Sequence, residues 1–252
     1  MSKEIAFYKG KENEDAFRYA ESLFSEFGDE YRLYSDDSLE NCKGAGALLF
    51  CGENAFCLAK SLRLHTVARL YSQDIFIDAY GQRKESGIKR GNSGREAYDL
   101  IRYPELEIEK TARTAFEWAE KYNKNMIAVD CADMLETGKL WRYVVQDVAQ
   151  DYLNVPIRYA FLSDYLCKGQ AENNIEDIVL TNSLVGGIIS QAFFAEEKLS
   201  GETICLFGDT TFAAYGREKQ PLCREGIKES ILWAIRESFN RPDQAEWLLN
   251  KQ

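Results

Sequence analysis

The sequence predicts an α/β protein, because short β-branched or apolar runs alternate with helical patterns along its 252 residues. Seven runs are predicted strands: 4–8, 46–51, 74–80, 126–130, 157–162, 177–181 and 203–207. Between them, apolar residues recur at helical spacing in two sets, Ala112, Ala115, Phe116 and Ala119, and Trp141, Val144, Val145, Val148, Ala149 and Tyr152. A last helix is expected near 226–239, with Ile227, Ile231, Ala234 and Ile235 facing inward.

The composition is that of a globular protein, with 45% hydrophobic and 29% charged residues. A chain of this length can bury a sizeable core. Its net charge of −10 argues against nucleic acid or an anionic membrane as a partner. The first residues, "MSKEIAFYKGKENEDAFRYAES", contain no apolar stretch typical of a signal peptide, so we expect a cytoplasmic location.

Cysteine and histidine usage argues against disulfides and zinc. The seven cysteines are odd in number and widely spaced, without a C-x-x-C pair. Cys51 and Cys205 lie in apolar runs, which favours buried free thiols. The single histidine, His65, cannot form a metal cluster by itself.

The stretch "DIVLTNSLVGGIISQAFFAEE" carries no charge between Asp177 and Glu196. It could be a membrane segment, a core element or an active site whose charges are missing. A membrane helix should not contain a strand followed by a polar turn, which Asn182 and Ser183 provide here. We therefore expect a strand, a turn and a helix that is buried nearly all round.

Three ordered motifs resemble one family. The segment "VDCADMLETGKLWRYVVQDVAQDY" (129–152) resembles a strand ending V-D-K-A-N, then L-E-x-x-x-x-W and a helix reaching D-Y. That pattern is found in the β-hydroxyacid oxidative decarboxylases, the isopropylmalate and isocitrate dehydrogenases. Residues 101–119 and 177–191 resemble two further motifs of the same family. The resemblance is strong over 97–195, weaker before it and faint after 200.

The resemblance implies a two-domain α/β sandwich. A discontinuous large domain would combine 1–72 with 201–252, and a small domain would span 73–200. It also implies a homodimer through the helices 139–152 and 183–197, whose burial would cover Leu184, Val185, Ile188, Ile189, Phe193 and Phe194.

Family members use NAD and Mg²⁺ or Mn²⁺, and this chain departs from their site residues. The three metal aspartates align with Ser163, Gly187 and Gln191. The catalytic lysine aligns with Cys131, which we expect to be a buried structural residue, and the catalytic tyrosine aligns with Lys89. We therefore expect no catalytic residue and no metal site, because neutral groups give too little charge for a hard cation.

Neighbouring carboxylates and the cofactor elements do not restore the pattern. Asp164 adjoins Ser163, but one step along a strand would turn its side chain to the opposite face. Only Gly10 remains of the family's first glycine motif, and Tyr215-Gly216 stands where its adenosine loop begins. No cofactor is expected, and no cofactor-binding residue is assigned.

The leading hypothesis is a binding or regulatory pseudoenzyme, with an active paralogue or another cytosolic protein as its partner. The alternatives are a divergent NAD(P)-dependent 2-hydroxy acid dehydrogenase and a metal-free enzyme that reuses the cleft. In the last case Arg63, Arg83 and Lys89 would hold an anionic ligand. A purely structural dimer is the third class.

Overall fold

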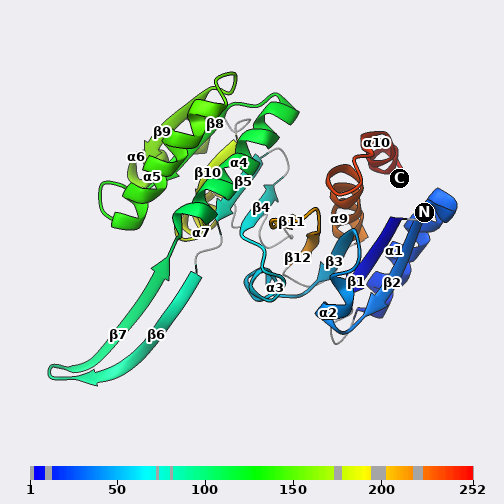
Figure 1. Ribbon diagram of the computed structural model, residues 1–252, viewed down its shortest axis with the longest axis horizontal. Helices are drawn as coiled ribbons and strands as arrows, with labels where there is room; N and C mark the ends of the chain where they lie inside the picture. Colours follow the sequence, from blue (N-terminus) through cyan, green and yellow to red (C-terminus); the bar gives the residue numbers. More distant parts are fainter. Residues whose placement is uncertain are drawn as a thin grey trace. The chain divides into compact units, whose positions relative to one another are not determined.

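The structure is a computed structural model that describes residues 3–8, 13–71, 74–79, 82–172, 178–193, 203–217 and 224–251. Its alternating strands and helices confirm the predicted α/β class (Figure 1). The chain divides into two compact units, Met1–Ser72 with Phe194–Gln252, and Gln73–Phe193. We call them the discontinuous unit and the central unit.

The discontinuous unit is built on six strands in the order β2-β1-β3-β12-β11-β4. Their bounds are β1 (Lys3–Tyr8), β2 (Tyr31–Asp36), β3 (Ala47–Cys51), β4 (Thr66–Tyr71), β11 (Thr203–Phe207) and β12 (Ala213–Arg217). β1 runs parallel to β2 and β3, and β3 parallel to β12. β11 runs antiparallel to both of its neighbours. Its buried position between β12 and β4 explains the apolar run "TICLF".

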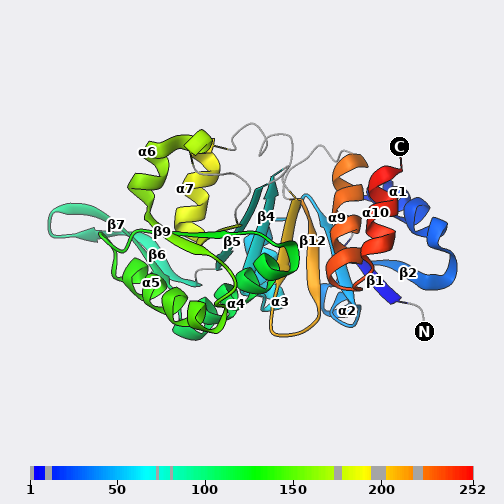
Figure 2. The same cartoon turned by 90° about the horizontal axis from the view of Figure 1, so that it is seen from above.

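Helices from both ends of the chain cover this sheet. They are α1 (Glu14–Phe24), α2 (Leu39–Cys42), α3 (Ala55–Leu62), α9 (Arg224–Glu237) and α10 (Pro242–Asn250). α9 packs on β3, β11 and β12 and in turn contacts α1 and α10 (Figure 2). The inward residues predicted for the helix near 226–239, Ile227, Ile231, Ala234 and Ile235, are buried. That helix is not the last one, because α10 follows it.

The central unit has four parallel strands in the order β5-β10-β8-β9. Their bounds are β5 (Asp74–Ala79), β8 (Met126–Asp130), β9 (Ile157–Phe161) and β10 (Ile178–Asn182). Two helix pairs pack against them: α4 (Glu105–Tyr122) with α5 (Glu136–Val148), and α6 (Leu162–Glu172) with α7 (Ser183–Phe193). Figure 2 shows the pairs on opposite sides of the strands, which explains why β8 and β10 are buried at every residue.

A two-stranded antiparallel hairpin also belongs to the central unit. It consists of β6 (Gln82–Gly91) and β7 (Gly94–Arg102), joined by Asn92 and Ser93. Figure 1 shows it as a ribbon extending away from the strands and helices of the central unit. We call residues 82–102 the arm.

Burial agrees with most of the predicted periodicity. Eight of the ten residues in the two helical sets predicted between the strands lie on α4 and α5 and are buried: Ala112, Ala115, Phe116, Ala119, Trp141, Val144, Val145 and Val148. The other two, Ala149 and Tyr152, follow the end of α5 and are half-buried. Among the helices that the structure describes, none combines the length and apolar character that a membrane span needs.

The prediction of buried free thiols is confirmed for Cys51 and Cys205, the two cysteines in apolar runs. All six cysteines in the described segments are free: Cys42, Cys51, Cys131 and Cys205 are buried, whereas Cys57 and Cys167 are exposed. Cys223 and Gly10 lie outside the described residues.

Candidate functional site

Three neighbouring strands of the central unit end at the same level. Asp130, the last residue of β8, is paired with Phe161, the last residue of β9. β10 is in register with β8 through Leu180 and Ala128, so it ends at the same edge. In parallel sheets, ligands bind outside the carboxyl ends of the strands. The candidate site is this edge, which we call the carboxyl edge.

The loop that leaves β8 is held by a buried ion pair. Asp130 is fully buried, and its Oδ1 accepts the N–H of Ala132 at 2.8 Å. Its Oδ2 accepts a hydrogen bond from Nε of Arg142 on α5 at 2.9 Å, and that guanidinium lies 4.3 Å from the ring centre of Phe161. Burial raises the pKa of Asp130, and the hydrogen bonds from Arg142 and Ala132 oppose that rise. The pair therefore ties β8, β9 and α5 together at the edge.

A glycine lets α5 approach this loop closely. A Cβ on Gly138 would lie 2.6 Å from the carbonyl carbon of Cys131 and 2.8 Å from the nitrogen of Ala132. Both are backbone atoms, so a side chain there would force the loop and the helix apart. The edge is thus rigidly built.

Cys131 follows β8 directly and is buried, with 9% of its surface exposed, as predicted. Burial raises the pKa of the Cys131 thiol, and the nearby carboxylates of Asp133 and Asp130 raise it further. A neutral buried thiol is a weak nucleophile and cannot deliver a proton as a lysine ammonium does. Chemistry at this residue is not favoured.

Ser163 lies at the carboxyl edge but not on a strand. β9 ends at Phe161, and both Ser163 and Asp164 are exposed residues in the first turn of α6. The predicted strand 157–162 was one residue too long, so the expectation that Asp164 faces the opposite side of a sheet is wrong. On a helix, adjacent residues point about 100° apart.

Gly187 and Gln191 lie one turn apart on α7, which begins directly after β10. Asn182 caps this helix, because its Oδ1 accepts the N–H of Val185 at 3.1 Å. Gln191 is exposed, and a Cβ added at Gly187 would meet no atom within 4 Å. The position aligned with a metal aspartate therefore has open space and no donor.

The expectation that this helix is buried nearly all round is wrong. Val185 and Ile189 are fully buried, but Leu184 and Ile188 are 44% and 40% exposed. Phe194 lies outside the described residues. One face of α7 packs on its own unit, and the other presents apolar side chains.

The donor set does not fit a divalent cation. Ser163 offers a hydroxyl, Gln191 an amide and Gly187 no side chain, whereas Mg²⁺ and Mn²⁺ prefer carboxylate oxygens. Across the described part of the chain, no three His, Cys, Asp or Glu side chains form a group that could hold a metal ion.

The predicted anion-binding residues belong to different parts of the chain. Arg63 belongs to the discontinuous unit, where it ends α3 in the left-handed conformation with φ 59°. Lys89 lies on the arm, with its Nζ 5.3 Å from the ring centre of Tyr98. Arg83 pairs with Ile101 in the arm's backbone ladder, and its side chain is outside the described structure.

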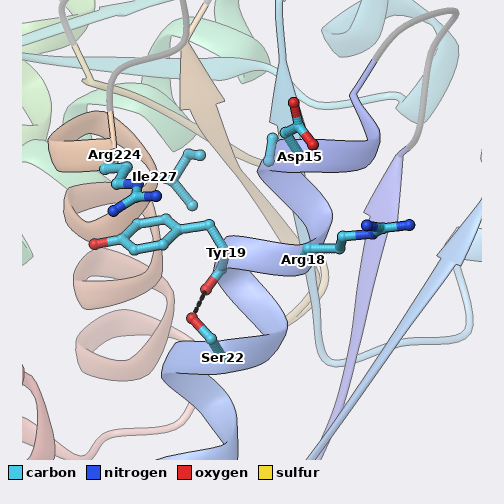
Figure 3. Close-up of a pocket in the computed structure, with 7 residues that line it drawn as sticks. Asp15, Arg18, Tyr19, Ser22, Arg224 and Ile227 are labelled. Carbon is cyan, nitrogen blue, oxygen red and sulfur yellow. Dashed lines mark hydrogen bonds between the residues drawn. The ribbon is translucent and has the colours of Figure 1, made fainter.

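A pocket of about 810 Å³ in the discontinuous unit does not form a site. It lies between α1 and α9 and is lined by Asp15, Ala16, Arg18, Tyr19, Ser22, Arg224 and Ile227 (Figure 3). Its polar groups diverge: Arg224 lies over the ring of Tyr19, and Arg18 points away from both. The Ser22 hydroxyl donates to the Tyr19 carbonyl at 2.7 Å.

Sequence reasoning missed Arg142, Gly138 and the arm. A signal for the arm was present, because Asn92 and Ser93 stand between two glycines, as is typical of a two-residue hairpin turn. No local pattern marks Arg142, since its partner lies in another element.

Comparisons with known proteins agree with this architecture. Residues 62–195 match the profile of the isocitrate/isopropylmalate dehydrogenase family. A 3-isopropylmalate dehydrogenase of Bordetella avium is 35% identical over 166 residues, which cover 60% of this chain and 45% of that protein. The enzyme of Bordetella pertussis is 38% identical over 96 residues, which cover 38% of this chain and 27% of the relative. The chain thus spans less than half the length of these relatives.

Solved structures share the fold at low sequence identity. Isocitrate dehydrogenase from Methylococcus capsulatus superposes with a TM-score of 0.79 at 13% identity, covering 98% of this chain and 88% of that one. A beta-decarboxylating dehydrogenase from Thermococcus kodakarensis gives 0.73 at 16% identity, covering 100% and 90%. The family profile matches more than half of the chain, and the fold agrees. The chain belongs to the isocitrate/isopropylmalate dehydrogenase family.

Proposed function

We propose that this protein has lost metal-dependent oxidative decarboxylation and acts as a binding or regulatory pseudoenzyme in the cytoplasm. The observation that carries the proposal is the chemistry of the carboxyl edge. The family motifs have a lysine at one position of this edge and aspartates at three others. In this chain the lysine position is Cys131, and the aspartate positions are Ser163, Gly187 and Gln191.

These replacements remove two requirements of the family's reaction, the metal ligands and a group for proton transfer. Without carboxylates, a divalent cation has too few charged oxygen ligands to polarise a hydroxyl or a developing enolate. Without the lysine, proton transfer has no group at this position, because the Cys131 thiol is neutral and buried. Each loss alone would slow the reaction, and all of them occur together.

The framework of the edge is retained while its donors are absent. The Asp130–Arg142 pair, the close approach at Gly138 and the Asn182 cap all hold the backbone in place. Retention of an ordered edge without its reactive groups favours a role in binding, with an active paralogue or another cytosolic protein as the partner.

A homodimer through 139–152 and 183–197 is part of the proposal. The exposed apolar face of α7, with Leu184 and Ile188, supports it, and α5 adds the exposed ring of Tyr143. The arm offers further apolar surface at Ile88, which is 74% exposed. A two-stranded hairpin alone is marginally stable in water, so a second copy would benefit it.

The second candidate is an active dehydrogenase, favoured by the names of the relatives, which are 3-isopropylmalate dehydrogenases. A variant of this candidate is a metal-free enzyme whose anionic ligand is held by Arg63, Arg83 and Lys89.

Calorimetric titration of the purified protein with Mn²⁺ and with NAD⁺ tests the proposal, beside an assay of NAD⁺ reduction with 3-isopropylmalate. We expect no stoichiometric Mn²⁺ binding and no NADH. One-to-one Mn²⁺ binding at micromolar affinity, or metal-dependent NADH formation, would contradict it. NADH formation without metal would favour the metal-free enzyme.

A designed variant tests whether these three positions account for the expected lack of metal binding. Combining Ser163→Asp, Gly187→Asp and Gln191→Asp should restore measurable Mn²⁺ affinity, because the open space at Gly187 accepts a side chain. The same three positions changed to Asn supply similar shapes without charge and should bind no metal. Equal behaviour of the two variants would mean that the site lies elsewhere.

A further inference from the structure

The arm is the most exposed described element of the central unit. From Gly87 to Leu100, every residue except Gly91 is exposed. Asn92 and Ser93 form its turn, flanked by Gly91 and Gly94, and Gly94 has φ 115°. The Ser93 hydroxyl is therefore presented at the tip of a projecting ribbon.

The charge of the arm is opposite to that of the whole chain. Residues 82–102 contain six Lys or Arg and three Asp or Glu, so the net charge of the arm is +3. Because the net charge of the whole chain is −10, the remaining residues carry −13. The arm is about 30 Å long at 3.3 Å per residue. That exceeds the Debye length of roughly 8 Å at physiological salt, so its tip is screened from distant charges.

Two arginines face each other next to the turn. Arg90 pairs directly with Arg95 in the ladder, so both side chains lie on the same face of the ribbon. Like charges directly opposite one another destabilise a strand pair. Within the described residues, neither guanidinium forms an ion pair with a carboxylate. The tip thus presents two arginines that have no carboxylate partner among the described residues. Ser93 lies between them in the sequence.

We propose that Ser93 is a phosphorylation site and that Arg90 and Arg95 clamp the phosphate. An arginine-directed serine kinase would supply the phosphoryl group from a nucleoside triphosphate. The Ser93 Oγ attacks the γ-phosphorus and a new O–P bond forms. The bond from that phosphorus to the bridging oxygen breaks, the nucleoside diphosphate leaves, and the hydroxyl proton passes to the kinase's carboxylate base.

The clamp follows from simple electrostatics. A phosphoserine carries about −1.5 to −2 charges and three acceptor oxygens, which guanidinium groups bind through charge-assisted hydrogen bonds. Its addition relieves the repulsion between Arg90 and Arg95 and lowers the arm's charge from +3 to about +1. Any partner attracted by the basic arm would then bind more weakly.

The structure, rather than the spacing of residues, selects Ser93. An arginine also stands three residues before Ser72, which lies outside the described residues, and before Ser86, which is held within β6 and paired with Asp99 of β7. The same spacing occurs at Arg32 and Ser35. Those two residues lie within β2, which is paired with β1 along its whole length, and Arg32 is 3.4 Å from Glu4. Ser35 serves as an internal control, because its backbone cannot be drawn into a kinase without opening the sheet.

The experiment incubates the full chain with an arginine-directed serine kinase and ATP, then maps phosphate by mass spectrometry. We expect one phosphate per chain at Ser93, none in Ser93→Ala, and none at Ser35. Failure to label Ser93, or equal labelling of Ser35, would overturn the assignment of the site.

A ³¹P NMR titration of the phosphorylated chain tests the clamp. The second pKa of a phosphoserine is roughly 6, and two facing guanidiniums should lower it by about one unit relative to a linear phosphopeptide of residues 88–97. Arg95→Gln keeps Arg90 for kinase recognition and should move the value back toward that of the peptide. A phosphate that titrates like the peptide, with no response to Arg95→Gln, would overturn the clamp.

Discussion

The carboxyl edge and the arm of the central unit differ in how their charged side chains are packed: Asp130 and Arg142 are paired in the interior of the edge, whereas the charged residues of the arm are exposed. At the edge, Asp130 and Arg142 are paired within a closely packed loop, and the four positions aligned with the family's lysine and aspartates are neutral. On the arm, side chains are exposed and carry net positive charge, and Arg90 faces Arg95. The buried ion pair at the edge therefore serves the fold, whereas charge on the arm is available to another molecule.

This difference separates two roles that an active enzyme combines. Enzyme sites hold ionisable groups on a rigid frame at some cost in stability. Here the frame remains at the edge, but the aligned positions that carry the reactive charges in the family are neutral. The comparison leads to measurable differences between substitutions in the two regions.

The largest expected loss comes from breaking the buried pair. Arg142→Met leaves the Asp130 carboxylate buried without its partner and should lower the free energy of unfolding by about 3–5 kcal/mol in urea titrations. Adding Asp130→Asn to that variant removes the buried charge and should recover part of the loss. A double variant less stable than Arg142→Met would show that the pair is not the cause.

The pH dependence of Arg142→Met has a defined sign. Burial would raise the folded-state pKa of Asp130 above its unfolded value of roughly 4, so the folded state binds the proton more tightly. The stability loss should therefore be full above the folded-state pKa and should shrink as the pH falls toward about 4. A loss that is constant with pH would contradict this account.

The next effect concerns assembly. Sedimentation equilibrium at micromolar concentration should give a species of twice the 28.9 kDa chain mass. Ile188→Glu should dissociate it, because a carboxylate buried in the interface without a partner costs several kcal/mol. Leu106→Glu is the matched control, since Leu106 is 59% exposed on α4, outside the proposed interface. A monomer in the unmodified protein would end the dimer proposal.

Two glycine substitutions test the packing of the edge. Gly138→Ala places a Cβ against the backbone of Cys131 and should cost about 1–3 kcal/mol. Gly187→Ala meets no atom and should stabilise α7 by about 0.5–1 kcal/mol. Similar changes in the urea midpoint for both would mean that the two positions do not differ in packing.

The sequence predicted the buried strands well, because continuous apolar runs in the centre of a parallel sheet carry a strong local signal. It also predicted that Cys131 follows β8 and that the helix containing Gly187 and Gln191 follows β10. It missed β2, β4 and β12, whose runs "YRLYSD", "TVARLY" and "AAYGR" include charged residues, among them the buried Arg69 and Arg217. Charged residues within a strand hide the pattern that predicts it.

The errors at the site have a common cause. Composition cannot distinguish the face of α7 that packs internally from the face that presents Leu184 and Ile188, since both are apolar. The end of β9 was misplaced by one residue, because nothing local separates "IRYAF" from the helix that follows. Arg142 was missed because its role depends on Asp130 twelve residues away, a contact made only in the folded chain.

The smallest expected effect lies on the arm. Ile88→Ser removes an apolar side chain that is 74% exposed, so no packed contact is lost within one chain. At concentrations low enough to give monomers, the free energy of unfolding should change by less than about 0.5 kcal/mol. If the arm joins the interface, the same substitution should weaken dimerisation, because burial of an isoleucine contributes up to about 1.5–3 kcal/mol. Arg18→Gln, an exposed change on α1, is the control and should alter neither quantity. A large loss in the monomer would show that Ile88 packs against its own chain, and the contrast between a packed edge and an available arm would then be wrong.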